Sequence, residues 1–311
     1  MTDKNTEKKT TSLTISMLVY NDEKWLSEAI ESILNQTYVD FKIILSDDCS
    51  TDRSSEICRE YAKKDKRVTY VRQPKNLGSY LHAKLLFESI DTVFFLTCSG
   101  HDMYHPQFIE KLLPILLNNR DIIVVYSRSQ TIKFNGEYGD VLQDDYSTDK
   151  INNPMSRYAY VFKNLRAASI FQGIWRSEVI KEIYLKPVIA NDTLMLIQAS
   201  IRGKFKQYPE ILFFMRQNRS PANNAKEEGV NNMFRRQIKM ITGSYPKFSK
   251  PLFLLKNQFI YENIKMILKE NLGWLPKLQL IIYSIYRGIY RLYIVPSLYP
   301  LYKKLKPSLN R

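Results

Sequence analysis

The stretch at residues 33–52 reads ILNQTYVDFKIILSDDCSTD, and it decides the fold class. Its middle, FKIILS at residues 41–46, is short, apolar and partly β-branched, which is typical of a buried strand. The strand runs directly into DDCSTD, where Ser50 or Thr51 can cap a helix. A strand that passes through a polar turn into a helix predicts one unit of a mainly parallel sheet.

The same alternation extends to both sides of this unit. Short apolar runs predict further strands, and stretches with apolar residues at helical spacing predict helices between them. The expected strands are 13–20, 67–70, 92–97 and 122–127. A later helix is expected from Asn191 or Asp192 to Ile201, ended by Gly203. Together these elements predict an α/β fold, a Rossmann-like three-layer sandwich over residues 13–242.

Composition indicates where the protein works. The chain has 311 residues and three cysteines, which are odd in number and form no CxxC pair. This pattern argues against a disulfide framework and a cysteine zinc site, so we expect a cytoplasmic protein. Residues 1–12 are polar and are expected to form a loose tail rather than a signal peptide. No run reaches the roughly 18 to 20 apolar residues that span a bilayer.

The positive charge of the chain is concentrated near its end. The formal net charge is +15, and residues 241–311 carry twelve Lys and Arg against two acids. Such a field can attract anionic lipid, nucleic acid or phosphorylated substrates, and charge alone does not choose among them. We expect residues 243–311 to form a basic, aromatic helical region. It lies on a membrane surface or packs against the main domain or a sister subunit, and the sequence leaves these alternatives open.

Three polar clusters follow expected strands, namely Tyr20 with Asn21, Asp47 with Asp48, and residues 99–102. Ligands of open parallel sheets bind outside the carboxyl ends of the strands, so these clusters are candidates for one site. A tyrosine and a carboxylate can hold a base or ribose, and a divalent cation that neutralises a diphosphate prefers oxygen ligands. Each cluster has a structural alternative, because Asn and Asp also cap helices and form turns.

Two other kinds of phosphate-binding loop do not occur in the chain. The sequence contains neither GxxxxGK[ST] nor GxGxxG, and it has only ten glycines. This argues against a P-loop kinase and a dinucleotide enzyme. Where a backbone must approach a ligand closely, Gly78 and Gly100 are the candidate positions, and a simple turn is the alternative for both.

Three segments, taken in order, resemble the family 2 glycosyltransferases with a GT-A fold. They are TISMLVYNDEKWLSEAIESILNQTYVDFKIILSDDCSTD at 14–52, KNLG at 75–78 and FFLTCSGHDMYHPQFIEKL at 94–112. The resemblance is strong over residues 13–120 and weaker to about residue 220. It implies an inverting transferase that moves a sugar from a nucleotide sugar, commonly a UDP-sugar, with Mn²⁺ or Mg²⁺. The acceptor is then a glycan or a lipid-linked sugar of a cell-surface polysaccharide, and nucleic acid is not expected as a partner.

The resemblance also assigns residues to the donor. SGHD at 99–102 stands where the family has a metal-binding motif of acids, so Ser99 and His101 replace two acids and Asp102 retains the last. Asp102 is expected to bind the metal and His101 to assist it or contact the diphosphate. These departures put the dependence on metal in question. The nucleotide is expected to contact Tyr20, Asn21, Asp48, Asn76 and Gly78.

Further residues are carried over from the later part of the family. Asp192 is expected to act as the catalytic base, with helix capping as its alternative, and Asn191 replaces a second acid. Arg216 is expected to contact a phosphate, with Asn218 near a histidine of the family. The expected acceptor contacts are Gln172, Trp175 and Arg176, with core packing the alternative for Trp175. His82 and His105 are expected in surface or capping roles.

A second function fits the same residues. The loss of two acids from the metal motif is compatible with a GT-A-fold protein that binds a nucleotide sugar or a partner without catalysis. Activity toward nucleotide sugars distinguishes the two hypotheses.

Overall fold

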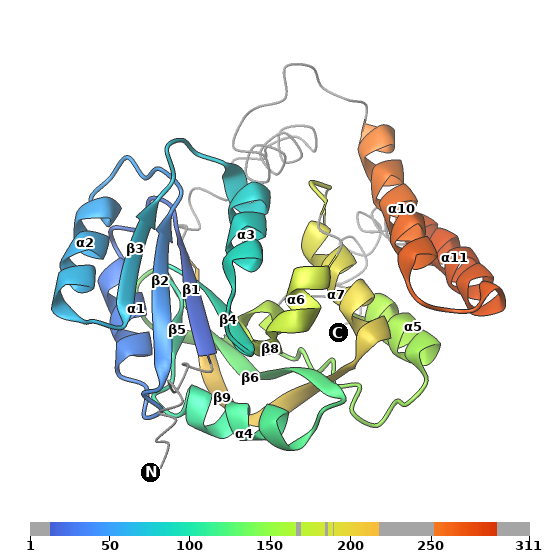
Figure 1. Cartoon of the computed structure of the whole chain (residues 1–311), viewed down its shortest axis with the longest axis horizontal. Coiled ribbons are helices and arrows are strands. Elements are labelled where there is room, and N and C mark those ends of the chain that lie inside the picture. Colours follow the sequence, from blue (N-terminus) through green and yellow to red (C-terminus); the bar gives the residue numbers. More distant parts are fainter. Residues whose placement is uncertain (1–12, 166–168, 184–185, 189, 218–251, 291–311) are drawn as a thin grey trace, which may run out of the picture.

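A computed structural model describes residues 13–165, 169–183, 186–188, 190–217 and 252–290, with only the backbone described for 252–256. Within these residues nine strands form one sheet in the order β3-β2-β1-β4-β8-β6-β9-β5, and β7 pairs with β6 (Figure 1). The strands are β1 (Leu13–Val19), β2 (Phe41–Asp47), β3 (Val68–Arg72), β4 (Phe94–Ser99), β5 (Met103–Tyr104), β6 (Ile122–Ile132), β7 (Tyr138–Val141), β8 (Ile174–Arg176) and β9 (Lys204–Arg216).

The long strand pairings are parallel, as the sequence predicts. β1 lies between β2 and β4 and runs parallel to both, and β2 runs parallel to β3. β6 and β9 form a second long parallel pair. The short strand β8 is antiparallel to both β4 and β6, and β5 is antiparallel to β9. The sheet is therefore mixed and mostly parallel, and the carboxyl ends of β1, β2 and β4 meet at one edge.

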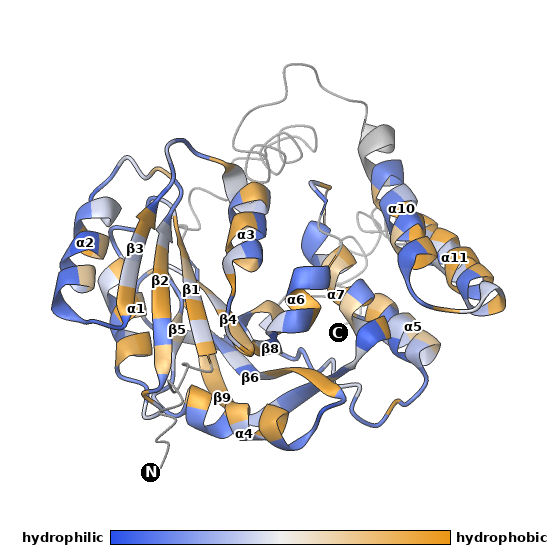
Figure 2. Cartoon of the chain, in the orientation of Figure 1, coloured by the Kyte–Doolittle hydropathy of each residue, from blue (hydrophilic) through white to orange (hydrophobic). Residues whose placement is uncertain are grey.

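Helices cover both faces of the sheet. In β4, Phe94, Leu96 and Cys98 belong to one hydrophobic core, and Phe95 belongs to the other, as expected for alternating side chains. The first core packs against α1 (Leu26–Leu34), α2 (Ser54–Lys64) and α4 (Phe108–Asn118). The second packs against α3 (Gly78–Ser89), α5 (Pro154–Asn164), the 3₁₀ turn η1 (Ser169–Gln172), α6 (Ser177–Glu182) and α7 (Asn191–Arg202). This arrangement confirms the three layers, with orange strands between the helices in Figure 2.

Two expected helix starts are displaced by several residues. α1 begins at Leu26 rather than directly after Asn21, and α2 begins at Ser54, so Ser50 and Thr51 do not cap it. The polar side chains instead connect the two loops. The Asn21 N–H donates to Ser50 Oγ at 3.1 Å, and the Thr51 N–H donates to Asn21 Oδ1 at 2.8 Å. Asn21, Ser50 and Thr51 therefore connect the loops that follow β1 and β2 and do not cap the helices α1 and α2.

Two C-terminal helices extend the second core. α10 (Leu252–Lys269) and α11 (Trp274–Ile289) pack against each other, and they contact α7 and α5 respectively. Phe259, Met266, Ile267 and Leu280 are buried in the same cluster as the residues of α5 and α7. The expected tail at 1–12 and the expected boundary at residue 243 lie outside the described residues. Within the described part of the chain, no helix is long and apolar enough to cross a membrane.

Candidate functional site

Backbone contacts hold together the three loops that follow β1, β2 and β4. The Asp48 N–H donates to the carbonyl of Val19 at 2.9 Å, and the Gly100 N–H donates to the carbonyl of Leu18 at 3.0 Å. The predicted polar clusters are thereby adjacent, at the carboxyl edge where ligands of such sheets bind. Tyr20 is 46% exposed at this edge, which leaves its ring accessible to a ligand.

Asp48, Asn76 and Gly78 meet as the sequence predicts. The Asp48 carboxylate accepts hydrogen bonds from the Leu77 N–H at 2.7 Å and the Gly78 N–H at 2.9 Å. Asn76 Oδ1 accepts from the same Gly78 N–H at 3.0 Å. Gly78 has a φ of +75°, a left-handed conformation that favours glycine. Asp48 therefore positions the start of α3, and its contact with a nucleotide stays a prediction.

Asp102 is the last residue of the loop at 99–102, and its side chain is buried. It is 4% exposed; its Oδ1 accepts from the Arg216 N–H at 2.8 Å, and its Oδ2 accepts from Ser99 Oγ. Burial raises the pKa of the Asp102 carboxyl, against the opposing charge of His101 and the hydrogen bond from Ser99. The carboxylate therefore connects the Ser99 loop with the end of β9.

His101 pairs with Asp22, a residue that is not among the predicted site residues. His101 Nδ1 donates to Asp22 Oδ1 at 2.9 Å. Burial alone would lower the pKa of His101, but the hydrogen bond to Asp22 and the charges of Asp102 and Asp22 outweigh it and raise that pKa. A Cβ on Gly100 would lie 2.7 Å from Asp22 Oδ2, so only glycine permits this approach. No local pattern identifies this pair, because the two residues are 79 positions apart.

Arg216 is enclosed by contacts within the protein, and its expected contact with a phosphate stays a prediction. Its side chain is 3% exposed and donates to Glu28 Oε2 at 2.6 Å and to the carbonyl of His101 at 3.0 Å. The guanidinium also lies 4.1 Å from the centre of the Trp25 ring. These contacts hold the 99–102 loop against α1, which is a positioning role. Asn218 lies outside the described residues.

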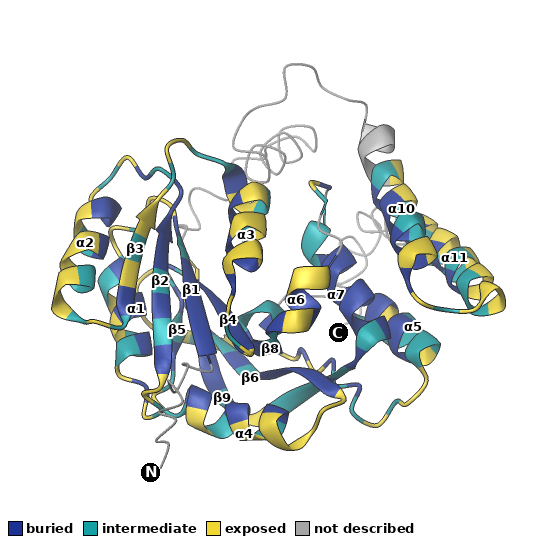
Figure 3. Cartoon of the chain, viewed as in Figure 1, coloured by how far each residue is buried: buried dark blue, intermediate teal, exposed yellow. Residues whose placement is uncertain are grey.

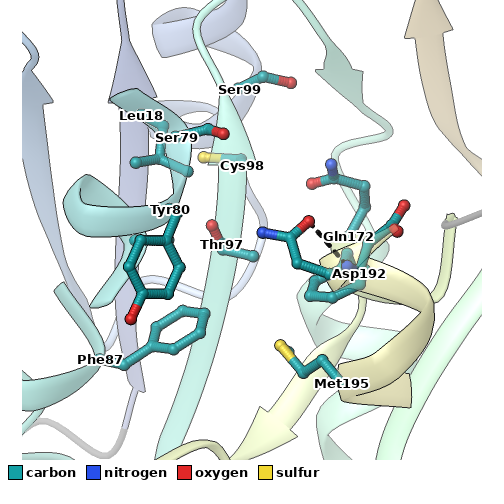
Figure 4. Close-up of a pocket in the computed structure, with 13 residues that line it drawn as sticks. Leu18, Ser79, Tyr80, Phe87, Thr97, Cys98, Ser99, Gln172, Asp192 and Met195 are labelled. Atoms are coloured by element: carbon teal, nitrogen blue, oxygen red, sulfur yellow. Dashed lines mark hydrogen bonds between the residues drawn. The ribbon is translucent and has the colours of Figure 1, made fainter. Parts of the chain in front are cut away.

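Asp192 and Gln172 line a common pocket of about 280 Å³ (Figure 4). Asp192 lies in the first turn of α7, where its Oδ1 accepts from the Thr193 N–H at 2.6 Å. The residue before this helix, Ala190, has a φ of +59°, a strained value for a side chain with a Cβ. Gln172 Oε1 accepts from the Tyr104 hydroxyl at 3.2 Å. The structure therefore brings the expected base and one expected acceptor contact to the same cavity.

Side chains of α3 and β4 form the other walls of the pocket, and of those named here only Ser99 is identified from the sequence. Ser79, Tyr80 and Phe87 come from α3, and Thr97 and Ser99 come from β4. Figure 4 shows Tyr80 and Phe87 on the side of the cavity opposite Asp192, with Met195 below it. Gly78, held by Asp48, directly precedes Ser79 and Tyr80, so the start of α3 joins the expected nucleotide loops to the pocket.

Two residues expected to contact the acceptor, Trp175 and Arg176, lie outside the lining of this pocket. Trp175 is completely buried, packed near the rings of Phe171 and Phe205, so core packing is its role. Arg176 pairs with Phe94 at the amino end of β4, away from the carboxyl edge. Its guanidinium donates to the backbone carbonyls of Leu116, Ile122 and Asn119. Antiparallel pairing of β8 with β4 places these two residues where a ligand at the edge cannot reach them.

The expected surface or capping role of His82 is wrong. His82 is 3% exposed on the inner side of α3, and its Nε2 lies 2.6 Å from Ser46 Oγ of β2. Burial lowers the pKa of His82, although the charges of Asp48 and Asp47 act in the opposite direction. His105, by contrast, accepts a hydrogen bond from the Gln107 N–H at 3.3 Å before α4, which is a capping contact.

The side chains around Asp102 do not by themselves form a divalent-metal site. In the part of the chain that the structure describes, no three His, Cys, Asp or Glu side chains converge as metal ligands. Both oxygens of Asp102 already accept hydrogen bonds, and His101 is paired with Asp22. Hard divalent cations require several oxygen ligands, so this donor set does not fit one. The expected binding of a metal by Asp102 finds no support in this arrangement of side chains, and it stays a prediction.

Comparison with known proteins identifies a family. Residues 14–184, more than half of the chain, match the family described as Glycosyl transferase family 2. An uncharacterised glycosyltransferase of Haemophilus influenzae is 26% identical over 242 residues, 73% of each chain. Another from Methanocaldococcus jannaschii is 33% identical over 134 residues, 42% of this chain and 45% of the relative. Glycosyltransferase GlyA of Streptococcus pneumoniae is 26% identical over 174 residues, 56% of this chain but 23% of that protein.

Solved structures show the same fold. Residues 1–349 of S. aureus TarS in complex with UDP superpose with a TM-score of 0.61 at 16% identity, covering 89% of this chain and 72% of that one. The complex of the same protein with UDP-GlcNAc gives a TM-score of 0.62 at 14% identity, with the same coverage. This similarity confirms the GT-A arrangement expected from the sequence.

Proposed function

Because the chain belongs to glycosyl transferase family 2, we propose that it moves a sugar from a nucleotide diphosphate to a hydroxyl of a glycan or lipid-linked acceptor, with inversion. One observation carries the proposal. The pocket that Asp192 lines is also lined by Ser79 and Tyr80, which directly follow Gly78, the residue that Asp48 holds at the start of α3. The expected base therefore faces a cavity that adjoins the loops expected to bind the nucleotide.

We propose a UDP-sugar as the donor. The TarS structures contain UDP and UDP-GlcNAc, and the shared fold makes the same class of donor the first to test. Tyr20, Asn21, Asp48, Asn76 and Gly78 form the expected nucleotide side of the site. The pocket volume is at the lower end for ligand sites, which suits a single sugar ring rather than the whole donor.

Asp192 acts as the general base in this proposal. Its carboxylate removes the proton from the acceptor hydroxyl while the oxygen attacks the anomeric carbon from the side opposite the nucleotide. Bond formation and departure of the diphosphate then occur on opposite faces of the sugar, which gives inversion. Gln172, on the same wall as Asp192, orients the acceptor. Because the pocket positions both reactants, no covalent nucleophile is required.

Asp192→Asn tests the role of the base. Asparagine keeps the size of the side chain but cannot accept the proton, so we expect release of nucleoside diphosphate to fall about 10²- to 10⁴-fold while the donor still binds. The assay measures UDP or GDP release over a panel of sugar nucleotides, and titration calorimetry measures donor binding. Asp40→Asn, an exposed carboxylate, is the matched control and should keep full turnover. Unchanged turnover in Asp192→Asn would refute the proposed base.

The alternative function is tested in the same experiment. A wild-type chain that binds a sugar nucleotide tightly but releases no nucleoside diphosphate with any acceptor would be a binding protein without catalysis. The expected dependence on Mn²⁺ or Mg²⁺ is tested by comparing EDTA with added metal. A role in cell-surface polysaccharide synthesis and a cytoplasmic location are further parts of the proposal, supported by the family and by the sequence composition.

A further inference from the structure

The exposed face of α11 is apolar, which is unusual for the solvent side of a helix. The exposed side chains of α11 that the structure describes include one polar residue, Gln279. The others are Trp274, Leu275, Leu278, Ile282, Ile285, Tyr286 and Ile289, and their exposed fractions range from 40% for Ile285 to 76% for Trp274. At 3.6 residues per turn these seven positions share an arc of about 120°. We call this set the α11 face.

The opposite side of α11 is the one that packs on the protein. Leu280, Ser284 and Gly288 are buried, and Ser284 Oγ lies 2.7 Å from Asn263 Nδ2 of α10. The Tyr283 hydroxyl donates to the carbonyl of Ala159 in α5 at 3.1 Å. α11 is therefore anchored in the fold by a small and partly polar side, while its apolar side points away. A helix that only packs on a domain shows the reverse pattern.

The position of α11 leaves this face accessible. α10 and α11 lie at the edge of the molecule opposite α1 and α2 (Figure 1). Figure 3 shows exposed residues along the length of α11. Figure 2 shows that much of the same helix is hydrophobic. Seven exposed apolar side chains that neighbour one another on a helix form the kind of contiguous patch that marks a binding surface.

The charge of α11 and of the sequence that follows it indicates the partner of the α11 face. Residues 271–311 contain seven Lys and Arg and no Asp or Glu, and two of these cations, Lys277 and Arg287, belong to the described helix α11. Lys277 Nζ donates to the carbonyl of Leu268 at 2.9 Å and Arg287 to that of Lys163 at 3.2 Å, and neither is in an ion pair with a described carboxylate. Their positive charges are therefore not neutralised. Exposed Trp and Tyr beside cations are the composition that favours the headgroup layer of an anionic bilayer.

We propose that the α11 face lies on the surface of an anionic lipid bilayer, parallel to its plane. Trp274, Ile282 and Ile289 enter the boundary between headgroups and acyl chains, and the cations on either side contact lipid phosphates. A second copy of the chain is a less suitable partner, because two regions that are both strongly basic would repel each other. The proposal does not depend on the catalytic role of Asp192, so either can fail without the other.

Vesicle binding by the full-length protein tests the proposal. We expect cosedimentation with vesicles of phosphatidylglycerol and phosphatidylcholine in equal parts, little with phosphatidylcholine alone, and weaker binding as salt increases. Ile282→Gln should weaken partitioning about tenfold, since it removes buried apolar surface. The matched control is Leu117→Gln on α4, because Leu117 is 61% exposed and Ile282 is 60% exposed. Leu117→Gln should leave partitioning unchanged.

Tryptophan fluorescence gives a second readout. Binding should shift the emission of Trp274 to shorter wavelength, and Trp274→Phe should abolish the shift while the protein still sediments with vesicles. Three outcomes overturn the proposal. They are absence of binding to anionic vesicles, an equal effect of Ile282→Gln and Leu117→Gln, and a concentration-dependent dimer that Ile282→Gln dissociates. The last result would assign the α11 face to contact between copies of the chain.

Discussion

At the scale of the residue, the site depends on polar groups that are held by partners distant in sequence. Asp48 positions Gly78, Asp22 pairs with His101, and Asp102 accepts from the backbone of Arg216. Each carboxylate is hydrogen-bonded, as buried polar groups must be. Several side chains that the sequence predicts to contact the ligand therefore hold the loops around the pocket in place. Asp192 differs, because it lines the cavity itself.

His82 provides a pH test at this scale. Its pKa is lowered from the usual 6.5 by burial, so the folded state binds a proton less readily than the unfolded chain. The stability that His82 contributes is therefore present above pH 6.5 and is lost as the pH falls toward the lowered pKa, with a slope of up to about 1.4 kcal/mol per pH unit. Denaturant unfolding between about pH 8 and 5.5 measures this slope. His82→Gln should have a shallower slope, and parallel curves would contradict the assignment.

At the scale of the element, α7 connects the pocket with the C-terminal helices. Its first turn carries Asp192, and its far end is held by Glu270, which follows α10. Glu270 Oε1 accepts from Gln198 Nε2 at 3.0 Å and from Arg202 at 3.2 Å. Because a helix moves nearly as a rigid rod, this contact also restrains the end that faces the cavity. α10 is therefore part of the support of the site.

Two glutamates on one arginine allow a matched test of that support. Glu270 is 8% exposed at its side chain and Glu182 is 72% exposed, and both contact Arg202. Glu270→Gln should lower the free energy of unfolding by about 2 kcal/mol, because it weakens a buried charge-assisted network. Glu182→Gln should cost less than about 1 kcal/mol, since exposed ion pairs contribute little. Equal losses measured by chemical denaturation would show that the Glu270 contact has no special role.

At the scale of the whole molecule, the described C-terminal helices share a core with the sheet. Phe259, Met266, Ile267 and Leu280 lie in one cluster with α5 and α7. The expected boundary at residue 243 stays a prediction, but the described part of the basic region 243–311 shares its core with α5 and α7. α10 supports the site, and α11, which packs against α10, presents the apolar α11 face.

Truncation tests this integration. A chain of residues 1–242 would lose the four buried apolar side chains of α10 and α11 named above, each contributing about 1.5 to 3 kcal/mol. The combined loss is comparable to the whole stability of a typical domain, about 5 to 15 kcal/mol. We expect this fragment to aggregate or unfold at a much lower temperature than the full chain in differential scanning calorimetry. A fragment with the melting temperature of the full chain would show that residues 13–242 fold on their own.

The sequence by itself determined the alternation of strands and helices, the mostly parallel sheet and the cluster of polar residues at its carboxyl edge. These features are local, because strand and helix periodicity and the residues that end a strand are written within a few positions. Tertiary structure alone decided which of those residues face a cavity. Arg216 and Asp102 meet across 114 positions, and α3 and α7 close one pocket although they are far apart in the chain. Hydrophobic periodicity shows that a helix has an apolar and a polar face, but it does not show which neighbouring element covers each face. For this reason the burial of His82 and the exposure of the apolar side of α11 could be found only in the folded chain.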